Sequence, residues 1–220
     1  PSAVRPATDA SSAVRRKAIE ASGTRIVVSI DARALWLMRG DEIVHSAPVA
    51  VGKHEGFTYG GKRYDFRTPI GVRKVLSKSP DPIWTPPDWH YFEKIVERGL
   101  EPVRLERGTK VELEDGSRVE IRGDQVGRVN QFGNFAPFTP GNEIVFDGKL
   151  FIPPFGTAQR RIPEILGTHK LEMGDAYLIH GTPERYTIGE AVSHGCIRMY
   201  NEDVSRLYEL VPLGTAIYIF

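Results

Sequence analysis

The sequence contains a single cysteine among its 220 residues, so no internal disulfide can form. One cysteine says little about the compartment, because an exported protein can carry one reactive thiol. No apolar run approaches the roughly 20 residues that a transmembrane helix needs. The formal net charge is +1 at pH 7, with Lys and Arg scattered along the chain. We therefore expect no nucleic-acid partner and no membrane span in this chain.

The remaining composition is that of a globular protein. Hydrophobic residues make up 40% of the chain and charged residues 26%, which is ordinary for a domain of useful core size. The chain begins at Pro1 rather than at a methionine, so a signal peptide cannot be read from it. Residues 1–23 are expected to be an N-terminal lead-in segment. Its stretch "SSAVRRKAIEASG" also suits a short helix ending at Gly23, and we favour the lead-in.

From Thr24 onward the pattern is mainly that of β-strands. "RIVVSID" is β-branched and apolar, and "ALWLMRGDEIVHSAPVAVG" predicts two strands joined by a turn at Gly40 and Asp41. "KVELEDGSRVEI" and "EIVFDGKLFIPP" predict two further hairpins around Asp-Gly turns. "DAYLIHG" predicts a strand that ends near His180, and "TAIYIF" predicts a closing strand.

Two segments in this pattern are helical. "DWHYFEKIVERG" suits a helix capped by Asp88 and ended by Gly99, with Trp89, Phe92 and Val96 on one face. "NEDVSRLYELVP" suits a helix capped by Asn201. Nothing resembles alternating βαβ units. The prediction is a mostly β fold with a few short helices.

The candidate chemistry lies in "LIHGTPERYTIGEAVSHGCIRM", which holds the only cysteine and two of the six histidines. A lone cysteine is usually a small buried hydrophobe, but Cys196 lies in a segment without apolar periodicity. Gly195 allows a sharp backbone turn beside the sulfur. An imidazole can take the proton of a thiol and return it to a leaving amine. The sequence therefore predicts acyl transfer, with either His180 or His194 as the base.

A zinc site is the main chemical alternative. His180, His194 and Cys196 are three residue types that bind zinc. Their spacing matches no familiar zinc pattern, and no fourth ligand is evident. We therefore expect no metal and no cofactor.

The stretch "IHGT…IG…SHGCIRM…ED…LY" resembles the L,D-transpeptidase catalytic domain, also called the YkuD domain. "TPIG" at Thr68–Gly71, "WTPPDW" at Trp84–Trp89 and "LGTHKLEMGDAYLIHGT" from Leu166 are also similar to the family pattern. The resemblance covers about residues 24–90 and 162–220 and is closest to envelope enzymes of Gram-negative type. It implies a β-sandwich with a helix cradling the sheets, and a catalytic domain over residues 24–220.

The resemblance also implies the roles of individual residues. Cys196 would be the nucleophile, and His180 the general base, held in its tautomer by a backbone carbonyl near Gly181. Gly195 and Cys196 would supply oxyanion N–H groups. His194 and Ser193 would shape the pocket, and Ser193 and Thr182 would also contact the substrate. Arg198 would bind a carboxylate of the peptide substrate.

The implied reaction begins with attack on a peptidoglycan tetrapeptide stem and loss of D-Ala, followed by attack of an amine to give a 3→3 cross-link. Water as acceptor would make a carboxypeptidase or amidase, and a lysine of an envelope protein would make an anchoring enzyme. A non-catalytic wall-binding protein is a further alternative. The resemblance implies a periplasmic or cell-envelope location, a part in cell-wall organisation and cell shape, and inactivation by carbapenems at the cysteine.

Residues 91–161 have no counterpart that we place in the family pattern. This stretch predicts hairpins of its own, and we expect it to be a large β-rich insertion or capping subdomain. Its aromatic residues, as a set, indicate walls of a cleft. They are Trp89, Tyr91, Phe92, Phe132, Phe135, Phe138 and Phe155.

Overall fold

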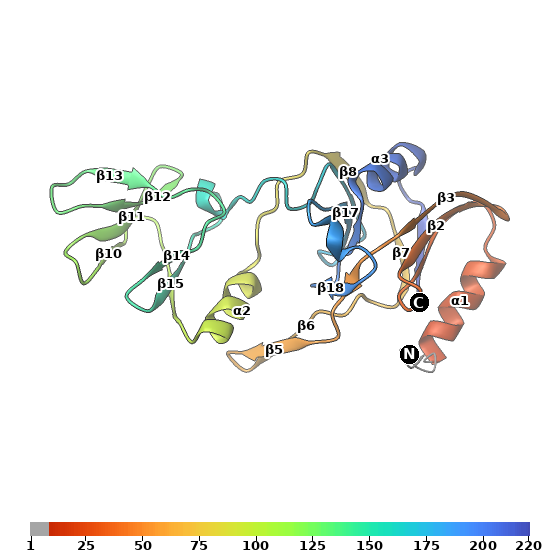
Figure 1. Cartoon of the computed structure of the whole chain (residues 1–220), viewed down its shortest axis with the longest axis horizontal. Helices are drawn as coiled ribbons and strands as arrows, with labels where there is room; N and C mark the ends of the chain where they lie inside the picture. Colours follow the sequence, from red (N-terminus) through yellow and green to blue (C-terminus); the bar gives the residue numbers. More distant parts are fainter. Residues whose placement is uncertain (1–8) are drawn as a thin grey trace. The chain divides into compact units, whose positions relative to one another are not determined.

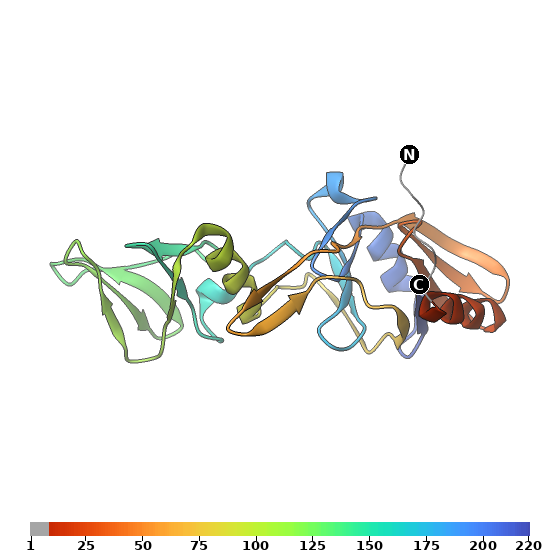
Figure 2. The ribbon, with the colours of Figure 1, turned by 90° about the horizontal axis from the view of Figure 1, so that it is seen from below.

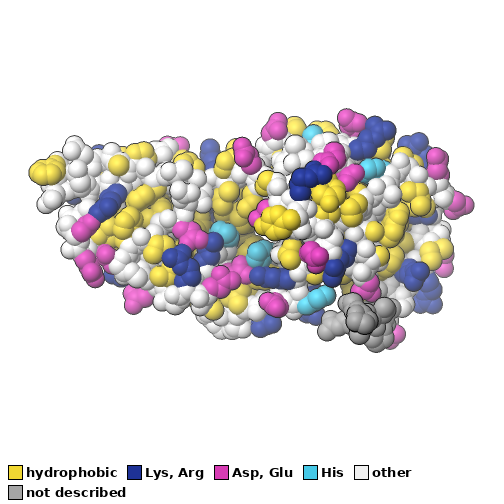
Figure 3. All heavy atoms as spheres, in the orientation of Figure 1, with side chains coloured by type: hydrophobic (Ala, Val, Ile, Leu, Met, Phe, Trp, Pro, Cys, Tyr) yellow, Lys and Arg dark blue, Asp and Glu magenta, His cyan; other side chains and the backbone are white. Residues whose placement is uncertain are grey.

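The structure is a computed structural model that describes residues 9–220. The chain divides into two compact units. The first unit extends to Gly56 and adds Asp65–Pro82 and Glu164–Phe220; the second comprises Phe57–Tyr64 and Ile83–Pro163. Within the described residues, no helix is long and apolar enough to cross a membrane. On the face drawn in Figure 3, side chains of both charges lie interspersed with hydrophobic ones, which fits the near-zero net charge.

The first unit holds a five-stranded sheet in the order β3-β2-β1-β20-β7. The predicted hairpin with its turn at Gly40 and Asp41 is confirmed, since β2 and β3 pair antiparallel on either side of it. The C-terminal strand pairs parallel with β1, so the chain closes beside its first strand (Figure 1). The bounds are β1 Thr24–Ser29, β2 Ala34–Arg39, β3 Glu42–Pro48, β7 Gly71–Lys74 and β20 Ala216–Ile219.

A second sheet of the same unit has the order β19-β17-β16-β8. One cluster of buried side chains takes Ile26 and Leu37 from the first sheet and Leu171, Ile179 and Ile197 from the second. The two sheets therefore enclose one core, and the predicted mostly β sandwich is confirmed. The strands are β8 Ser77–Pro80, β16 His169–Glu172, β17 Leu178–Gly181 and β19 Ile197–Met199, with a separate pair of β4 Val51–Gly52 and β18 Ala191–Ser193.

Helix α3 (Asn201–Leu210) follows β19 and contacts β16 and β17. Its Val204 and Leu207 are fully buried in the sandwich core, so this helix covers the sheet that carries the predicted histidine. The predicted cap is wrong. Tyr200 is the N-cap, and the amide oxygen of Asn201 accepts the backbone N–H of Thr168 at 3.2 Å.

Helix α1 (Asp9–Glu20) lies in the segment expected to be a lead-in, of which residues 1–8 are outside the described part. Val14 and Ala18, four residues apart on one face, are buried. The helix contacts β20 and β7, and the C-terminus lies beside it (Figure 2). Arg25 is buried and donates to the carbonyls of Ala18 at 2.9 Å and Gly40 at 2.8 Å, which stabilises the last turn of the helix.

The second unit begins, after the hairpin of β5 (Gly56–Tyr59) and β6 (Lys62–Asp65), with helix α2 (Asp88–Arg98). Gly99 ends this helix in the left-handed conformation, as predicted, with its N–H bonded to the Ile95 carbonyl. The predicted cap and face are wrong. Pro87 is the N-cap, Asp88 is already helical, and the buried face is Tyr91, Phe92 and Ile95, while Val96 is 49% exposed.

The remaining strands of the second unit confirm both predicted Asp-Gly hairpins, with Val111 opposite Val119 and Phe146 opposite Lys149. Two buried clusters, one around Phe151 and one around Phe92, give this unit its own core. The strands are β9 Glu101–Arg104, β10 Lys110–Glu112, β11 Arg118–Arg122, β12 Gln125–Val129, β13 Phe135–Pro137, β14 Ile144–Phe146 and β15 Lys149–Ile152, and a 3₁₀ turn spans Ala158–Arg160.

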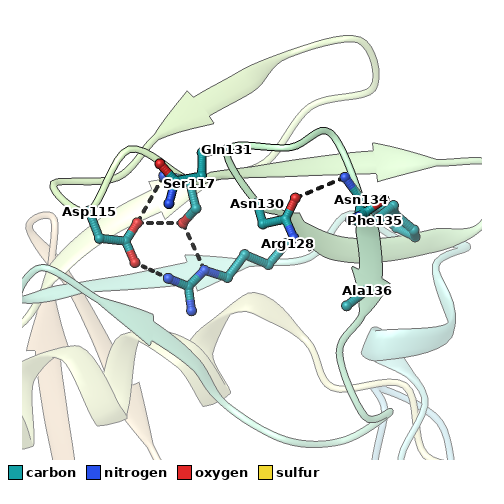
Figure 4. A pocket seen from close by; sticks show the side chains of 8 residues that line it. All are labelled: Asp115, Ser117, Arg128, Asn130, Gln131, Asn134, Phe135 and Ala136. Atoms are coloured by element: carbon teal, nitrogen blue, oxygen red, sulfur yellow. Dashed lines mark hydrogen bonds and ion pairs between the residues drawn. The ribbon is translucent and has the colours of Figure 1, made fainter.

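The aromatic side chains of this unit do not form one wall. Tyr91 and Phe92 are buried in its core, whereas Phe132 is 82% exposed and Phe155 61% exposed. The unit holds a pocket of about 350 Å³ in which the Asp115 carboxylate accepts from the Ser117 hydroxyl and from the guanidinium of Arg128 (Figure 4). None of the predicted site residues lines this pocket.

Candidate active site

Two neighbouring strands position the predicted residues. Strands β17 and β19 pair in parallel, with His180 directly opposite Arg198. Ile179 and Ile197 point into the sandwich core and are fully buried. Because side chains alternate along a strand, His180 and Arg198 lie on the other face of the sheet. Cys196 lies two residues before Arg198 and directly before the first residue of β19.

His180 is buried, and its Nδ1 lies 2.6 Å from the carbonyl oxygen of Gly181. A carbonyl can only accept, so Nδ1 carries the proton and Nε2 is left with a lone pair. Burial lowers the pKa of His180 to about 4, aided by the charge of Arg198, while hydrogen bonds to the Gly181 and Leu166 carbonyls oppose the shift. The imidazole is therefore neutral at pH 7 and able to accept a proton.

The residue Cys196 as a whole is of intermediate exposure. Burial of its sulfur raises the pKa of the Cys196 thiol, and this effect outweighs a backbone hydrogen bond from Leu178 and the charge of Arg198, which both lower it. The thiol is therefore protonated at neutral pH. The resting site combines a neutral thiol with a neutral imidazole, which is the arrangement for general-base activation during attack.

The loop before Cys196 is held by its own polar groups. Ser193 is buried, its hydroxyl donates to the Cys196 carbonyl at 2.5 Å, and it accepts the Gly195 N–H at 3.2 Å. Gly195 has φ +108°, and a Cβ there would lie 2.6 Å from Cε1 of Tyr177. A residue with a Cβ would therefore be strained and crowded in this turn.

Gly195 lies between His194 and Cys196 with φ +108°, so the backbone that joins them is not extended. The His194 ring packs edge-on against Phe66, with ring centroids 4.5 Å apart and an interplanar angle of 82°. Of the two histidines left open by the sequence, His180 lies on the strand that pairs with β19, which follows directly on Cys196.

Thr182 and Ser193, both expected to bind substrate, make hydrogen bonds within their own loops. Thr182 is 2% exposed, and its hydroxyl accepts the backbone N–H of Glu184 at 3.1 Å. Ser193 is 1% exposed and bonded as described above. Both hydroxyls support the local loop structure, and a role in substrate binding stays a prediction.

Arg198 is the remaining predicted binding residue. Its side chain is 17% exposed, and its Nη1 donates to Oε2 of Glu184 at 2.8 Å. Glu184 lies in the connection between β17 and β18 and was not singled out from the sequence. The only sequence feature that could have drawn attention to Glu184 is its charge, four residues after His180.

The packing of the segment around Gly167 against the end of β17 was not predicted from the sequence. Gly167 and Gly181 pack so closely that a Cβ on Gly167 would lie 2.5 Å from the Gly181 carbonyl carbon. The hydroxyl of Thr168 contacts that of Ser205 at 3.0 Å, which ties this segment to α3. The contact joins residues 37 positions apart, and no local pattern signals it.

No metal centre emerges within residues 9–220, since no group of three or more His, Cys, Asp or Glu side chains there is arranged to hold an ion.

Strand β17 carries a buried neutral imidazole, and its parallel neighbour β19 follows directly on the thiol of Cys196. This arrangement defines a candidate cysteine acyl-transfer site. The family model described as the L,D-transpeptidase catalytic domain, YkuD, matches residues 23–219. The chain therefore belongs to the YkuD family.

Named relatives share shorter segments. The probable L,D-transpeptidase YbiS of Escherichia coli K12 is 48% identical over 52 residues, which cover 24% of this chain and 17% of that protein. The putative L,D-transpeptidase YkuD of Bacillus subtilis is 56% identical over 43 residues, or 20% and 26% of the two chains. The matches thus span less than a third of these relatives. Among solved structures, an L,D-transpeptidase from Mycobacterium smegmatis aligns over 90% of this chain and 59% of its own, with 15% identity and a TM-score of 0.49.

Proposed function

We propose that this protein is a peptidoglycan L,D-transpeptidase in which Cys196 is the nucleophile and His180 the general base. Membership of the YkuD family supports the reaction class. The observation that supports the residue assignment is the parallel pairing of β17 and β19, which sets His180 opposite Arg198, two residues after Cys196. The fixed tautomer of His180 supports its role as the base.

The first half-reaction forms a thioester. The sulfur of Cys196 attacks the carbonyl carbon of the third residue of a tetrapeptide stem, while Nε2 of His180 takes the thiol proton. The amide bond to D-Ala then breaks, and His180 returns the proton to the leaving amine. The Gly195 N–H already donates to Ser193, so the oxyanion donor within this loop is the Cys196 N–H, an interaction worth about 2.7–4 kcal/mol in comparable sites.

The second half-reaction resolves the thioester. An amine of a second stem attacks the acyl carbon, His180 takes one amine proton, and the sulfur leaves and is reprotonated. The product is a 3→3 cross-link. Water in place of the amine would yield a tripeptide, and a lysine of an envelope protein would yield an anchored protein. We place the reaction in the periplasm or cell envelope, where stem peptides lie, with a part in cell-wall organisation and cell shape.

Muropeptide analysis after incubation with tetrapeptide-rich sacculi tests this proposal. We expect dimers linked 3→3 from the wild-type protein and none from Cys196→Ala. Tripeptides alone would make the protein a carboxypeptidase. An unchanged muropeptide profile in the presence of folded wild-type protein would contradict the enzymatic function and favour a wall-binding protein.

A further inference from the structure

The pocket of the second unit is a candidate site that the proposed reaction does not use. Its volume of about 350 Å³ is within the range of ligand pockets, roughly 300–1,000 Å³. The pocket lies between two turns, one joining β10 to β11 and the other joining β12 to β13. Because these strands pair antiparallel in sequence order, both turns lie at the same end of the sheet. The second unit therefore builds this pocket by itself.

One side of the pocket is a polar network in which the two charges neutralise each other. The Asp115 carboxylate accepts the Ser117 N–H at 2.9 Å and the Ser117 hydroxyl at 2.5 Å, and it pairs with the guanidinium of Arg128 (Figure 4). Nε of Arg128 also donates to the Ser117 hydroxyl at 2.7 Å. Ser117 is 5% exposed, so this side is held in a fixed geometry. A neutral network of this kind does not require a charged ligand.

The other side of the pocket is the loop at 130–134, which the protein orders through its own hydrogen bonds. Oδ1 of Asn130 accepts the backbone N–H groups of Phe132 and Asn134, each at 3.0 Å. The Asn130 N–H donates to the Asn134 carbonyl at 3.0 Å, and the Gly133 N–H donates to the Asn130 carbonyl at 2.9 Å. Because the loop is already ordered, a ligand would bind its side chains with little ordering cost.

This loop presents side-chain amides that keep unused hydrogen-bonding capacity. Within residues 9–220, the side chains of Gln131 and Asn134 make no hydrogen bond, although both line the pocket. Each amide carries an oxygen acceptor and two N–H donors on one planar group. Phe135 and Ala136 add apolar surface to the same pocket. The pocket thus combines neutral donors, neutral acceptors and an aromatic ring.

The same loop carries an aromatic side chain outside the pocket. Phe132 follows Gln131 and is 82% exposed, so its ring is not part of the core of this unit. An exposed ring can stack on the apolar face of a ligand that extends past the pocket. A ligand with several rings suits this arrangement better than a single small molecule.

We propose that the pocket binds an N-acetylated amino sugar within a glycan chain. Sugar hydroxyls and the acetamido group both donate and accept hydrogen bonds, which matches the amides of Gln131 and Asn134. The acetamido methyl and the apolar face of the sugar ring match Phe135. Identifying this glycan as the sugar strand of peptidoglycan rests on the proposed function, whereas binding of the sugar to the pocket does not.

A titration of the isotope-labelled full chain with chitotetraose, a linear tetramer of N-acetylglucosamine, tests the site by NMR. We expect saturable shifts of the backbone amides in 115–117 and 128–136, with a Kd of about 1 mM. Cellotetraose, the matching tetramer of glucose, has a hydroxyl in place of each acetamido group. It should bind about tenfold more weakly, because it cannot make the acetamido hydrogen bonds.

Two variants remove the proposed contacts without removing a bond of the fold. Gln131→Ala and Asn134→Ala should each weaken chitotetraose binding by about five- to tenfold. Asn142→Ala is the matched control, because Asn142 is an exposed amide of the same unit that does not line the pocket. It should bind chitotetraose as the wild type does.

The readout does not depend on turnover, so the site and the proposed reaction are judged separately. Shifts absent from the pocket residues, or equal affinities of both variants and the wild type, would overturn the site. Equal binding of cellotetraose would overturn the assignment to an N-acetylated sugar. Chitotetraose binding at the pocket, in a protein that leaves sacculi unchanged, would uphold the site and contradict the proposed function. Cross-linking of sacculi without any shift at the pocket would contradict the site alone.

Discussion

The His180 side chain is buried, and its Nδ1 is held in a hydrogen bond. The contact of Nδ1 with the Gly181 carbonyl fixes the tautomer, and burial holds the pKa at about 4. Arg198 disfavours a charged imidazole and favours a thiolate, so its charge acts on the two reacting groups in opposite senses. At the residue scale, the Cys196 thiol is therefore protonated and the His180 imidazole neutral at pH 7.

The lowered pKa of His180 makes stability depend on pH. The unfolded chain binds a proton near the ordinary pKa of 6.5, whereas the folded chain does so only near 4. Stability from neutral His180 is complete above pH 6.5 and is lost as the pH falls toward 4. We expect the free energy of unfolding, measured with urea, to fall by about 2 kcal/mol more in the wild type than in His180→Gln between pH 6.5 and 5. Equal falls in both proteins would contradict a buried neutral His180.

The two histidines of the motif should differ in their effect on catalysis. His180→Ala removes the proposed base and should lower kcat about 10²–10⁴-fold, the usual range for a general base. His194→Ala removes a ring packed on Phe66 and should lower kcat by about tenfold at most. Rates of D-Ala release from a tetrapeptide give the comparison. The opposite order would make His194 the base.

At the scale of elements, local sequence patterns predicted which segments form strands and turns better than they predicted which strands pair with one another. The hairpins at Gly40 and Gly148 and the helix end at Gly99 followed from turn chemistry. The pairing of β17 with β19 joins residues 18 apart in the chain, such as His180 and Arg198, and no local signal specifies it. The same holds for Asn201, whose amide serves Thr168 rather than its own helix.

The motif singled out Cys196 because its glycine-containing segment lacks the periodicity of a core strand, and His180 because it ends a predicted strand; their catalytic roles stay predictions. The ion pair of Glu184 with Arg198 could not be predicted, because no local pattern joins these two residues. Helix α1 was undervalued because its burial depends on a sheet completed by the last strand of the chain. Each omission thus involves a contact between segments distant in sequence.

The turn before Cys196 should tolerate no side chain at Gly195. An alanine there has an unfavourable φ of +108°, costing about 1–3 kcal/mol, and its Cβ meets Tyr177 at 2.6 Å. Gly189→Ala is the control, because Gly189 has φ +92° with nothing within 4 Å of a Cβ. We expect Gly195→Ala to be less stable than the control by about 1 kcal/mol and to slow alkylation of Cys196 by iodoacetamide. Equal behaviour of the two variants would show that the Tyr177 contact is unimportant.

At the scale of the molecule, each unit has buried clusters of its own. The first unit has the sandwich core around Leu37 and Ile179, and the second has two clusters, one around Phe151 and one around Phe92. The second unit takes its sequence from two separate stretches, because the hairpin at 57–64 packs its aromatic rings on Phe92. The expected insertion at 91–161 lies within this unit, and its role in capping the cleft stays a prediction.

Separate cores should respond separately to core mutations. Phe151 is fully buried, so Phe151→Ala should destabilise its unit by about 3–5 kcal/mol. Hydrogen exchange should accelerate in residues 57–64 and 83–163 and stay unchanged in β1 and β20. Leu37→Ala should show the converse pattern. Acceleration by the same factor in both units would indicate a single cooperative fold.

The central claim is that the sulfur of Cys196 carries the acyl group. Intact-mass measurement of the protein after rapid mixing with a tetrapeptide stem tests it most directly, with a carbapenem as a second acylating probe. The account predicts that the wild-type protein gains the mass of the stem minus that of D-Ala, that the added group maps to Cys196, and that Cys196→Ala gains no mass. An adduct of equal extent on Cys196→Ala, or D-Ala release by that variant, would contradict it.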